Sequence, residues 1–537
     1  MGGLTMSDDF DAIIIGAGMS GMYQLLRLRQ LGMRVRVFET GTGVGGTWYW
    51  NRYPGARFDS ESYSYGFSFS PELLQEWSWS EHFAPQPETL RYLNHVADRF
   101  DLRRDIQFNS RVASAVYREA TRDWAVTLDD GSVHAARFLI TAVGPLSAAT
   151  LPNIEGRDSF QGQSFHTYYW PHEPVDFVGK RVAVIGTGAT GVQTIQEVAK
   201  TAAQLTVFQR RPNWCAPLHN RPITDEEQVQ IKASYPDIFR RCEETFACFL
   251  HTGDPRGTFE VTAEVREAFL ERLYSEPGFG IWVGLFRDML IDPAANAIVS
   301  DFIARKIRSR VKDQAVAEKL IPTDHGFGTR RVPLETRYYE VYNQPNVTLV
   351  DIKETPIERI TPSGIRTSNA DYAFDIIVFA TGFDALTGSF DRIDIRGEGG
   401  VTLKQKWSGG AQTLMGMLVE GFPNLLMLLG PHTALGNIPR SIEYNVDWVS
   451  RLLAFMQQHG QRHVAARPEA VAAWMTHVME CGEGLLSNQV DSWFTGVNSN
   501  VEGKQTRVIA RYSGSAPDYR AWCERIAADG YPELVLD

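Results

Sequence analysis

The chain has 537 residues, of which 43% are hydrophobic and 22% charged. This length exceeds one small core and favours two or three domains of an ordinary soluble globular protein. Its 53 basic and 64 acidic residues give a net charge of -11, which argues against general affinity for nucleic acid. No apolar run approaches the ~20 residues that a bilayer-spanning helix needs, so no membrane partner is expected.

The amino end and the cysteines favour a reduced, cytoplasmic protein. Residues 1–10 lack a basic region followed by an apolar core, so no secretory signal is expected. The five cysteines are odd in number and contain no Cys-x-x-Cys pair. Neither a disulfide framework nor a zinc ribbon is expected from that pattern, and no metal ligands are assigned.

A dinucleotide-binding pattern opens the chain. It consists of an apolar strand over 11–15, the turn Gly16-Ala17-Gly18-Met19-Ser20-Gly21, a helix over 22–31 and a strand over 34–38 that ends at Glu39. Glycines in such a turn let the backbone approach a pyrophosphate at the amino end of the helix, and the acid accepts hydrogen bonds from a ribose. A tight turn without a ligand is the alternative, but the correctly spaced acid favours a nucleotide site.

An aromatic loop follows in the first segment. Residues 43–59 combine glycines, aromatic side chains and one acid, Asp59, as a loop that wraps a flat ring system would; a packing loop is the alternative. The sequence further predicts a helix over 87–100, strands over 112–126 and 138–141, and a closing glycine turn over 142–145.

A second dinucleotide pattern differs from the first in charge. Its elements are a strand over 181–185, the turn Gly186-Thr187-Gly188-Ala189-Thr190-Gly191, a helix over 192–200 and a strand over 205–208. That last strand ends in Gln209-Arg210-Arg211, where the first pattern has Glu39. Guanidinium groups favour a 2′-phosphate over a free ribose hydroxyl, so the first unit is predicted to hold FAD and the second NADPH. A solvated arginine pair is the alternative.

Residues 216–324 are interpreted as a helical insertion. Thr224 and Glu227 have the spacing of a capping box. Apolar residues recur on one helix face at Val299, Ile303, Ile307 and Val311. The basic side chains over 305–312 lie between those positions, so they are expected to form a solvated face with no binding partner.

The remaining segments are predicted to complete both units. They comprise strands over 346–352, 375–379 and 425–429 and helices over 441–458, 469–479 and 518–528. The strand over 375–379 ends in Ala380-Thr381-Gly382 and is expected to lead back into the first domain. The predicted fold class is α/β, with two Rossmann-like domains and a helical insertion. The FAD domain comprises 1–145 and 373–537, the NADPH domain 146–215 and 325–372, and the insertion 216–324.

The segment between the two units carries the motif Phe-x-Gly-x-x-x-His-x-x-x-Trp-Pro, at Phe160, Gly162, His166, Trp170 and Pro171. With this motif the chain resembles the type I Baeyer–Villiger monooxygenases, the flavoprotein group that includes cyclohexanone and phenylacetone monooxygenases. Segments that also look like that family, in its order, are 45–59, Arg330-Arg331, 380–382, 421–424 and 492–496. The resemblance covers roughly residues 8–537. Flavin-containing and N-hydroxylating monooxygenases share the two nucleotide folds but usually differ at Trp170-Pro171.

The resemblance implies a reaction. NADPH reduces FAD, dioxygen adds to the reduced flavin, and the resulting peroxide anion attacks a ketone to give an ester or lactone while NADP⁺ stays bound. The partners would be a small-molecule ketone and dioxygen, and the oligomeric state stays open between monomer and weak dimer. An amine- or sulfide-oxygenating flavin monooxygenase is the alternative. A disulfide reductase would need a redox-active cysteine pair, and a nucleotide-sensing module would not need the aromatic loop or Arg331.

The resemblance also implies roles for particular residues. A peroxide anion and an adduct oxyanion need fixed positive charge in a dry site. Arg331 is expected next to the flavin with Asp59 as its partner, and Arg330 at the 2′-phosphate. The residues assigned to FAD are Gly16, Gly18, Ser20, Gly21, Glu39, Thr47, Trp48, Asp59, Tyr65 and Val112. Those assigned to NADP are Gly186, Gly188, Thr190, Gly191, Gln193, Arg210, Arg211, Arg330, Arg331 and Trp493.

Three further expectations concern positioning and access. The motif, His166 included, is assigned to coupling of the domains rather than to the chemistry. Trp493 is expected on a mobile loop that closes over NADPH, with a core tryptophan as the alternative. The turn over 430–437 is short compared with the bulged form in part of the family. If that turn lines the substrate pocket, the pocket would admit a bulkier ketone.

Overall fold

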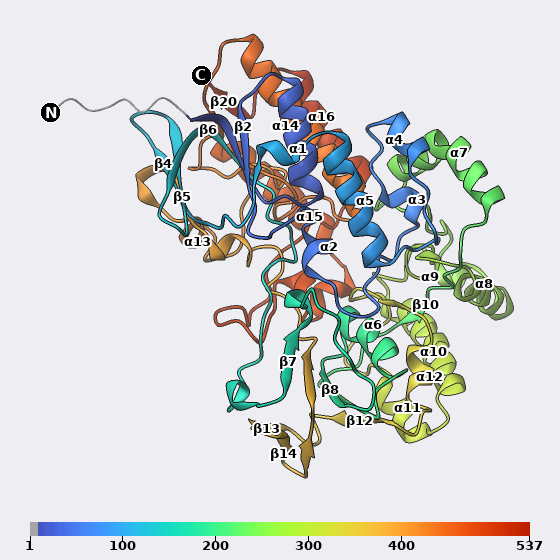
Figure 1. Ribbon diagram of the computed structural model, residues 1–537. Helices are drawn as coiled ribbons and strands as arrows, with labels where there is room; N and C mark the ends of the chain where they lie inside the picture. The colour runs from blue at the N-terminus through green and yellow to red at the C-terminus, as the bar shows by residue number, and fades with distance from the viewer. Residues whose placement is uncertain (1–8) are drawn as a thin grey trace.

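Two separate β-sheets organise the computed structural model, which describes residues 9–537 (Figure 1). The predicted α/β class with two Rossmann-like units is confirmed. The expectation of no secretory signal falls mainly on residues 1–8, which lie outside the described residues. Within the described part, no helix is both long and apolar enough to span a membrane.

The first sheet has eight strands and carries the first dinucleotide pattern. Its order is β17-β4-β5-β6-β1-β2-β3, with β18 also paired to β6. The strands are β1 (Phe10–Ile15), β2 (Val35–Phe38), β3 (Ile106–Gln107), β4 (Val112–Arg118), β5 (Asp123–Leu128), β6 (Val133–Thr141), β17 (Asp394–Arg396) and β18 (Leu425–Met427). The range 112–126, predicted as strand, thus contains most of the antiparallel pair β4 and β5. β1 pairs in parallel with β2 and β6, so the carboxyl ends of these strands meet at one edge, where α/β proteins bind nucleotides.

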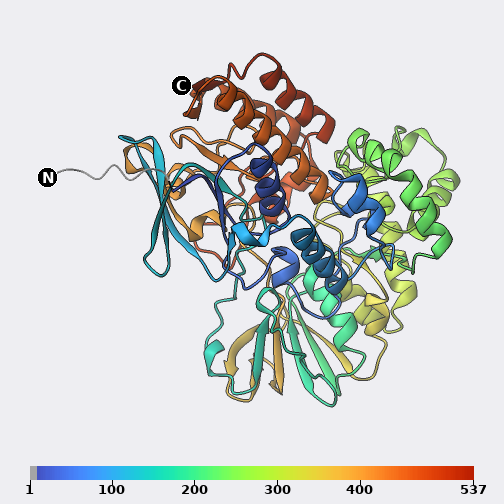
Figure 2. The ribbon, with the colours of Figure 1, turned by 45° about the horizontal axis from the view of Figure 1, so that its top comes forward.

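Helices from both ends of the chain cover this sheet. They are α1 (Met19–Gln30), α5 (Gln86–Arg99), α14 (Ile438–Gln458), α15 (Pro468–Gly482) and α16 (Ala516–Ala528). Figures 1 and 2 both show α1 beside α14. The Tyr23 hydroxyl donates to Asp447 Oδ1 at 2.8 Å, and Gln24 Nε2 donates to Ser450 Oγ at 3.0 Å. The carboxyl-terminal helix α14 therefore packs on the helix that follows β1.

The second sheet has five parallel strands in the order β12-β9-β8-β16-β7. They are β7 (Gln163–His166), β8 (Arg181–Ile185), β9 (Gln204–Gln209), β12 (Val347–Asp351) and β16 (Ile376–Phe379), with α6 (Ala189–Val198) following β8. The domain boundary predicted at residue 373 is wrong, because β16 pairs with β8 on one side and β7 on the other. The first unit resumes only after β16.

The chain crosses between the two units at two adjacent segments, 142–150 and 380–386. Thr150 N donates to Gly382 O at 3.0 Å, and Thr381 Oγ1 donates to Thr150 O at 2.6 Å. We call these paired segments the crossing. They are hydrogen-bonded to each other as well as to the units that they join.

The insertion forms a separate group of helices beside the second sheet, in green and yellow-green at the right of Figure 2. It contains β10 (Ala216–Pro217), α7 (Asp225–Glu244), α8 (Ala263–Ser275), α9 (Gly280–Val283), α10 (Pro293–Arg310) and α11 (Gln314–Leu320). The predicted capping box between Thr224 and Glu227 is confirmed. So is the apolar face of α10, because Val299, Ile303 and Ile307 are buried.

Short elements complete the structure. Helices of this kind are α2 (Thr47–Trp50), α3 (Ser62–Tyr65), α4 (Pro71–Glu76), α12 (Tyr338–Val341) and α13 (Leu403–Lys406). Short strands are β11 (Leu334–Glu335), β13 (Ile357–Thr361), β14 (Gly364–Thr367), β15 (Asp371–Ala373), β19 (Val464–Ala466) and β20 (Leu534–Leu536).

One residue predicted to be solvated lies in a buried ion pair. Arg310 Nη1 is 2.7 Å from Glu335 Oε1, and Arg310 Nη2 is 2.7 Å from Glu340 Oε2. The Glu335 side chain is fully buried, and these carboxylates raise the pKa of Arg310 against the effect of burial. The expectation fails for Arg310 because α12 packs against α10. Arg308, by contrast, pairs with Glu318 at the surface, as expected of a solvated face.

We predict that Arg310→Leu lowers the free energy of unfolding by about 3–5 kcal/mol, because Glu335 then stays buried without a counter-charge. Arg308→Leu is the matched control on the same helix, and its exposed ion pair contributes about 0–1 kcal/mol. Urea unfolding followed by circular dichroism measures both. Equal midpoints for the two variants would show that the buried pair contributes no more than the surface pair.

Candidate active site

The first glycine turn brings strand, helix and crossing into very close contact. Gly16 has φ 105°, and a Cβ there would lie 2.6 Å from Ala142 O. A Cβ on Gly21 would lie 1.9 Å from Gly16 O. Only glycine fits at both positions, so α1 starts directly above the end of β1. The backbone N–H groups at the start of α1 are thereby presented at the sheet edge, where they can bind phosphate.

A cavity of about 290 Å³ opens at this turn. It is bounded by the ends of β1 and β2, by α2 and by the segment after β6. The predicted FAD residues that line it are Gly16, Gly18, Ser20, Glu39, Thr47, Trp48, Tyr65 and Val112. Of the other two, Gly21 packs beneath the turn and Asp59 pairs with Arg331. These polar and aromatic walls fit a dinucleotide carrying a flat ring system, and we call this space the flavin-sized cavity.

Several lining residues were not predicted. Tyr168 and Tyr169 reach the cavity from the unspecified positions of the motif, and Arg392 reaches it from the segment after the crossing. Trp50 stacks on Tyr168 with ring centroids 5.7 Å apart. No local signal marks these side chains, because they meet only after the two units have docked.

Glu39 occupies a buried position at the end of β2. Its Oε2 accepts from Ala17 N at 2.7 Å, and its Oε1 accepts from Gly41 N at 2.7 Å. Burial raises the pKa of Glu39, although these backbone N–H groups act in the opposite direction. The carboxylate therefore fixes the glycine turn to the loop after β2 while it also lines the cavity.

Arg331 and Asp59 form an ion pair where the two units meet. Arg331 Nη2 donates to Asp59 Oδ2 at 2.7 Å, and Leu334 N donates to the same oxygen at 3.3 Å. Asp59 is only 3% exposed; burial raises its pKa, and Arg331 is the main group that lowers it. Among residues 9–537, Arg331 Nη1 and Asp59 Oδ1 have no hydrogen-bond partner. The pair thus keeps polar atoms available for a bound group.

The second glycine turn repeats the geometry of the first. Gly186 has φ 109°, and a Cβ there would lie 2.4 Å from Ala380 O. A Cβ on Gly191 would lie 2.2 Å from Gly186 O. Gly188 lies between them as the N-cap residue of α6, and a Cβ there would meet no atom within 4 Å beyond its own chain neighbours. The start of α6 is thus a second helix end at which backbone N–H groups can bind phosphate.

Three arginines gather near the end of β9. Burial lowers the pKa of Arg330, and the charges of Arg211 and Arg210 lower it further. Arg211 Nε is 3.6 Å from Asp324 Oδ2, which compensates one of the charges. Among the described residues, Arg330 Nε has no hydrogen-bond partner. This concentration of guanidinium groups fits a phosphate dianion.

The aromatic loop of the first unit docks on the helix of the second. The Tyr53 hydroxyl donates to Gln193 Oε1 at 2.8 Å, and Gln193 Nε2 donates to Arg57 O at 3.0 Å. A Cβ on Gly55 would lie 2.6 Å from Gln193 O, so this approach also requires glycine. Gln193, assigned to NADP from the sequence, contacts the aromatic loop here, and Thr190 lies one turn earlier on α6.

The motif is part of the second sheet rather than a free linker. It includes β7, whose His166 pairs in register with Phe379 of β16. His166 Nδ1 accepts from Tyr168 N at 3.0 Å, and burial lowers the pKa of His166 to about 4. A Cβ on Gly162 would lie 2.5 Å from the Phe160 ring. His166 is therefore neutral at pH 7 and organises the turn that follows β7.

Trp170 and Pro171 end the motif beside the first unit. Trp170 is buried, with its ring 5.2 Å from Phe165 and 6.3 Å from Phe177. The adjoining Tyr169 reaches the flavin-sized cavity. The motif thus carries side chains into the packing of both units.

Residues 490–511, which we call the C-terminal loop, lie against the arginine cluster and the crossing. Arg330 Nη2 donates to Asp491 O at 2.6 Å, and Arg210 Nη1 donates to Ser499 Oγ at 2.7 Å. Asn498 Nδ2 donates to Phe383 O of the crossing at 2.8 Å. Trp493 is half-buried at the start of this loop, with its ring 4.4 Å from that of Phe494. Trp493 is therefore not fully buried in a core.

Two dinucleotide-type glycine turns, one in each unit, define a flavoprotein that also uses a nicotinamide nucleotide, and its cofactors are FAD and NADPH. The pyridine nucleotide-disulphide oxidoreductase family model matches residues 13–233. A 2-oxo-Δ3-4,5,5-trimethylcyclopentenylacetyl-CoA monooxygenase of Pseudomonas putida is 46% identical over 99% of both chains. A Baeyer–Villiger monooxygenase of Pseudooceanicola batsensis is 40% identical over 99% of this chain and 97% of that protein.

Solved structures agree with these relatives. A crystal structure of OTEMO in complex with FAD and NADP has a TM-score of 0.95 and 46% identity, covering 99% of this chain and 100% of the other. The chain belongs to the Baeyer–Villiger monooxygenase family, as the sequence resemblance predicts.

We predict that Gly21→Ala is purified without the yellow flavin, because its Cβ would force α1 away from Gly16 O. The control is Gly188→Ala, which has free space for a methyl group and an ordinary φ of -74°. That variant should keep FAD and show a raised KM for NADPH, since the methyl group would obstruct an approaching pyrophosphate. Absorbance near the flavin bands and NADPH kinetics measure both effects. Full flavin content in Gly21→Ala would refute the packing argument.

Proposed function

We propose that the protein catalyses NADPH- and dioxygen-dependent insertion of an oxygen atom next to a ketone carbonyl, giving an ester or lactone. The observation that supports this most directly is the Arg331–Asp59 ion pair, held at 2.7 Å where the two units meet. Negative charge develops on oxygen when a nucleophile adds to a carbonyl, and a fixed guanidinium stabilises it.

FAD and NADPH supply, when bound, the reducing equivalents and the activation of dioxygen. The chain's own contribution is binding, orientation and electrostatics. Arg331 presents a guanidinium whose direction is fixed by its hydrogen bond to Asp59. Burial of Asp59 strengthens this interaction, since few water molecules compete for either group.

The remaining residue assignments follow from their positions. Arg210, Arg211 and Arg330 would hold the 2′-phosphate of NADP, and the two glycine turns would hold the pyrophosphates. Trp493 would lie over the nicotinamide nucleotide when the C-terminal loop is docked. His166 would serve in coupling the units, because a histidine with a pKa of about 4 holds no proton to give at pH 7.

A cyclic ketone with bulky substituents is the substrate class that we favour. The Pseudomonas putida relative is named for a substituted cyclopentenyl compound. In this chain the turn over 430–437 does not itself line the flavin-sized cavity, whereas Leu429, Ile438 and Ile442 on either side of it do. The turn is held against the insertion, because Asn437 N donates to Ala247 O at 2.9 Å. Apolar groups of a ketone would meet the flanking side chains rather than the turn.

Product analysis tests the activity and the substrate class together. The holoenzyme is incubated with NADPH, ¹⁸O₂ and matched small and bulky cyclic ketones, with an aryl sulfide as the rival substrate. One labelled oxygen in a lactone, formed in step with NADPH loss, is the expected result. Oxygenation of the sulfide alone would contradict the proposed function, and turnover of small ketones alone would contradict only the substrate class.

The five cysteines support an assignment to the cytoplasm. All are free thiols, and Cys215, Cys242, Cys248 and Cys523 are buried. A reducing compartment is the setting in which unpaired thiols persist. Fractionation of cells that produce the protein would test the assignment, and its recovery in an extracytoplasmic fraction would refute it.

Arg331→Ala is predicted to lower oxygenated product by about 100-fold to 1,000-fold while FAD stays bound, because charge stabilisation at a reacting oxygen is lost. Arg331→Lys should recover part of the activity, since a lysine keeps the charge but not the forked donors. Asp59→Asn should also impair product formation by releasing the guanidinium. Stopped-flow reduction by NADPH without oxygen, compared with product yield, separates the steps. Wild-type yield in Arg331→Ala would refute the proposed role.

A further inference from the structure

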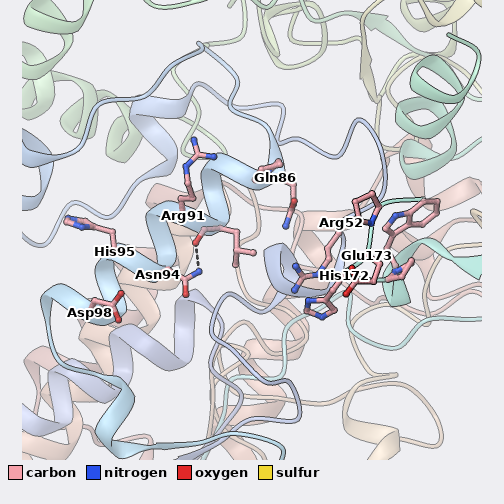
Figure 3. A pocket seen from close by; sticks show the side chains of 13 residues that line it. Arg52, Gln86, Arg91, Asn94, His95, Asp98, His172 and Glu173 are labelled. Atoms are coloured by element: carbon pink, nitrogen blue, oxygen red, sulfur yellow. Dashed lines mark hydrogen bonds between the residues drawn. The ribbon is translucent and has the colours of Figure 1, made fainter. Parts of the chain in front are cut away.

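A second cavity lies on the outside of the joint between the two units. It has a volume of about 720 Å³ and runs between α5 and the segment 170–174 that ends the motif (Figure 3). None of its lining residues belongs to the flavin-sized cavity. Its volume lies within the ~300–1,000 Å³ that small-molecule sites occupy. We call this cavity the joint groove.

Arg52 is a preorganised cation in the joint groove. Its guanidinium carbon lies 4.6 Å from the centroid of the Tyr49 ring, and Thr42 N donates to the Tyr49 hydroxyl at 3.0 Å. Burial lowers the pKa of Arg52, and across residues 9–537 no carboxylate forms an ion pair with it. A partly desolvated guanidinium that forms no ion pair favours an anionic ligand.

A second uncompensated arginine comes from the opposite wall. Arg91 is exposed on α5 and has no ion pair in the described part of the chain. Two other polar side chains of this wall have partners outside the groove, since Asp98 is 2.6 Å from Arg103 and His95 is 3.6 Å from Glu76. The groove therefore has one guanidinium group on each of its two walls, and neither forms an ion pair among residues 9–537.

The rest of the lining suits a sugar and a ring. Glu173 lies beside Arg52 and His172 in Figure 3, where its carboxylate can accept hydrogen bonds from ribose hydroxyls. Trp170 and Pro171 add an apolar wall next to these polar groups. Inorganic phosphate alone would leave that wall and Glu173 unused.

We propose that the joint groove binds a nucleoside diphosphate group, with its phosphates on Arg52 and Arg91 and its nucleoside against Glu173, Trp170 and Pro171. This group could be a free nucleotide or the nucleotide part of a coenzyme A thioester. The second source rests on the proposed oxygenation of ketones, whereas binding itself does not. The site would be independent of the FAD and NADP sites, because it shares no lining residue with the flavin-sized cavity and contains no residue of either glycine turn.

Calorimetric titration of the holoenzyme, with FAD bound and NADP⁺ saturating, tests the proposal. ADP and coenzyme A are titrated separately, so that the free nucleotide and the coenzyme are distinguished. We expect saturable binding of ADP, of coenzyme A or of both. The dissociation constant should rise about tenfold or more in Arg52→Ala and in Arg91→Ala. The matched control is Arg525→Ala, because Arg525 is likewise stacked on an aromatic ring, 4.2 Å from that of Trp522, but lies on α16.

Two further comparisons define the outcome. Glu173→Gln should weaken the binding of ADP but not that of inorganic pyrophosphate, because only the nucleoside carries ribose hydroxyls. Absence of saturable binding by the wild type at millimolar ADP and coenzyme A would overturn the proposal, as would unchanged binding in Arg91→Ala, an exposed substitution that should not disturb folding. Pyrophosphate binding as tightly as ADP would overturn the nucleoside part. None of these results depends on ketone turnover.

Discussion

The ion pair between Arg331 and Asp59 depends on the whole arrangement of the molecule. Asp59 ends the aromatic loop of the first unit, whereas Arg331 comes from the segment that returns from the insertion to the second unit. A buried carboxylate is costly unless a cation and a hydrogen-bond donor compensate it, and Arg331 and Leu334 N do so here. The contact of the aromatic loop with Gln193 on α6 holds the loop at the distance that this pair requires. The position of the Arg331 guanidinium therefore depends on how the two units dock.

The two dinucleotide sites have the same glycine turn between strand and helix, but they differ in charge at the ends of β2 and β9. In each, glycines remove the Cβ atoms that would separate helix from strand, and the segment behind the turn approaches within contact distance. In the first site Glu39 uses its carboxylate to join the turn to the next loop. In the second, the arginine cluster leaves positive charge in that region. The two sites therefore share the geometry of their glycine turns and differ in the charge at the end of the second strand.

Sequence reasoning predicts the local features of this structure well. The glycine turns, the capping box at Thr224 and the apolar face of α10 depend on residues close together in the chain, and all are present. Features that depend on partners far away in the chain are harder to predict from the sequence. The position of β16 in the second sheet follows from pairing with β7 and β8, and the burial of Arg310 follows from Glu335 being placed beside it. The entry of Tyr168 and Tyr169 into the first cavity likewise requires the units to have docked.

The crossing has a thermodynamic consequence for ligands of the second unit. Besides its internal hydrogen bonds, it receives those of the C-terminal loop, because Asn498 donates to Phe383 O and Asn500 donates to Thr381 O. The same loop contacts Arg210 and Arg330. Lifting the loop removes its bonds to the crossing and leaves the two segments with fewer constraints on rotation of one unit against the other. Because such coupling is reciprocal, a nucleotide that favours the docked loop also stiffens the crossing, and a stiffer crossing raises the affinity for that nucleotide.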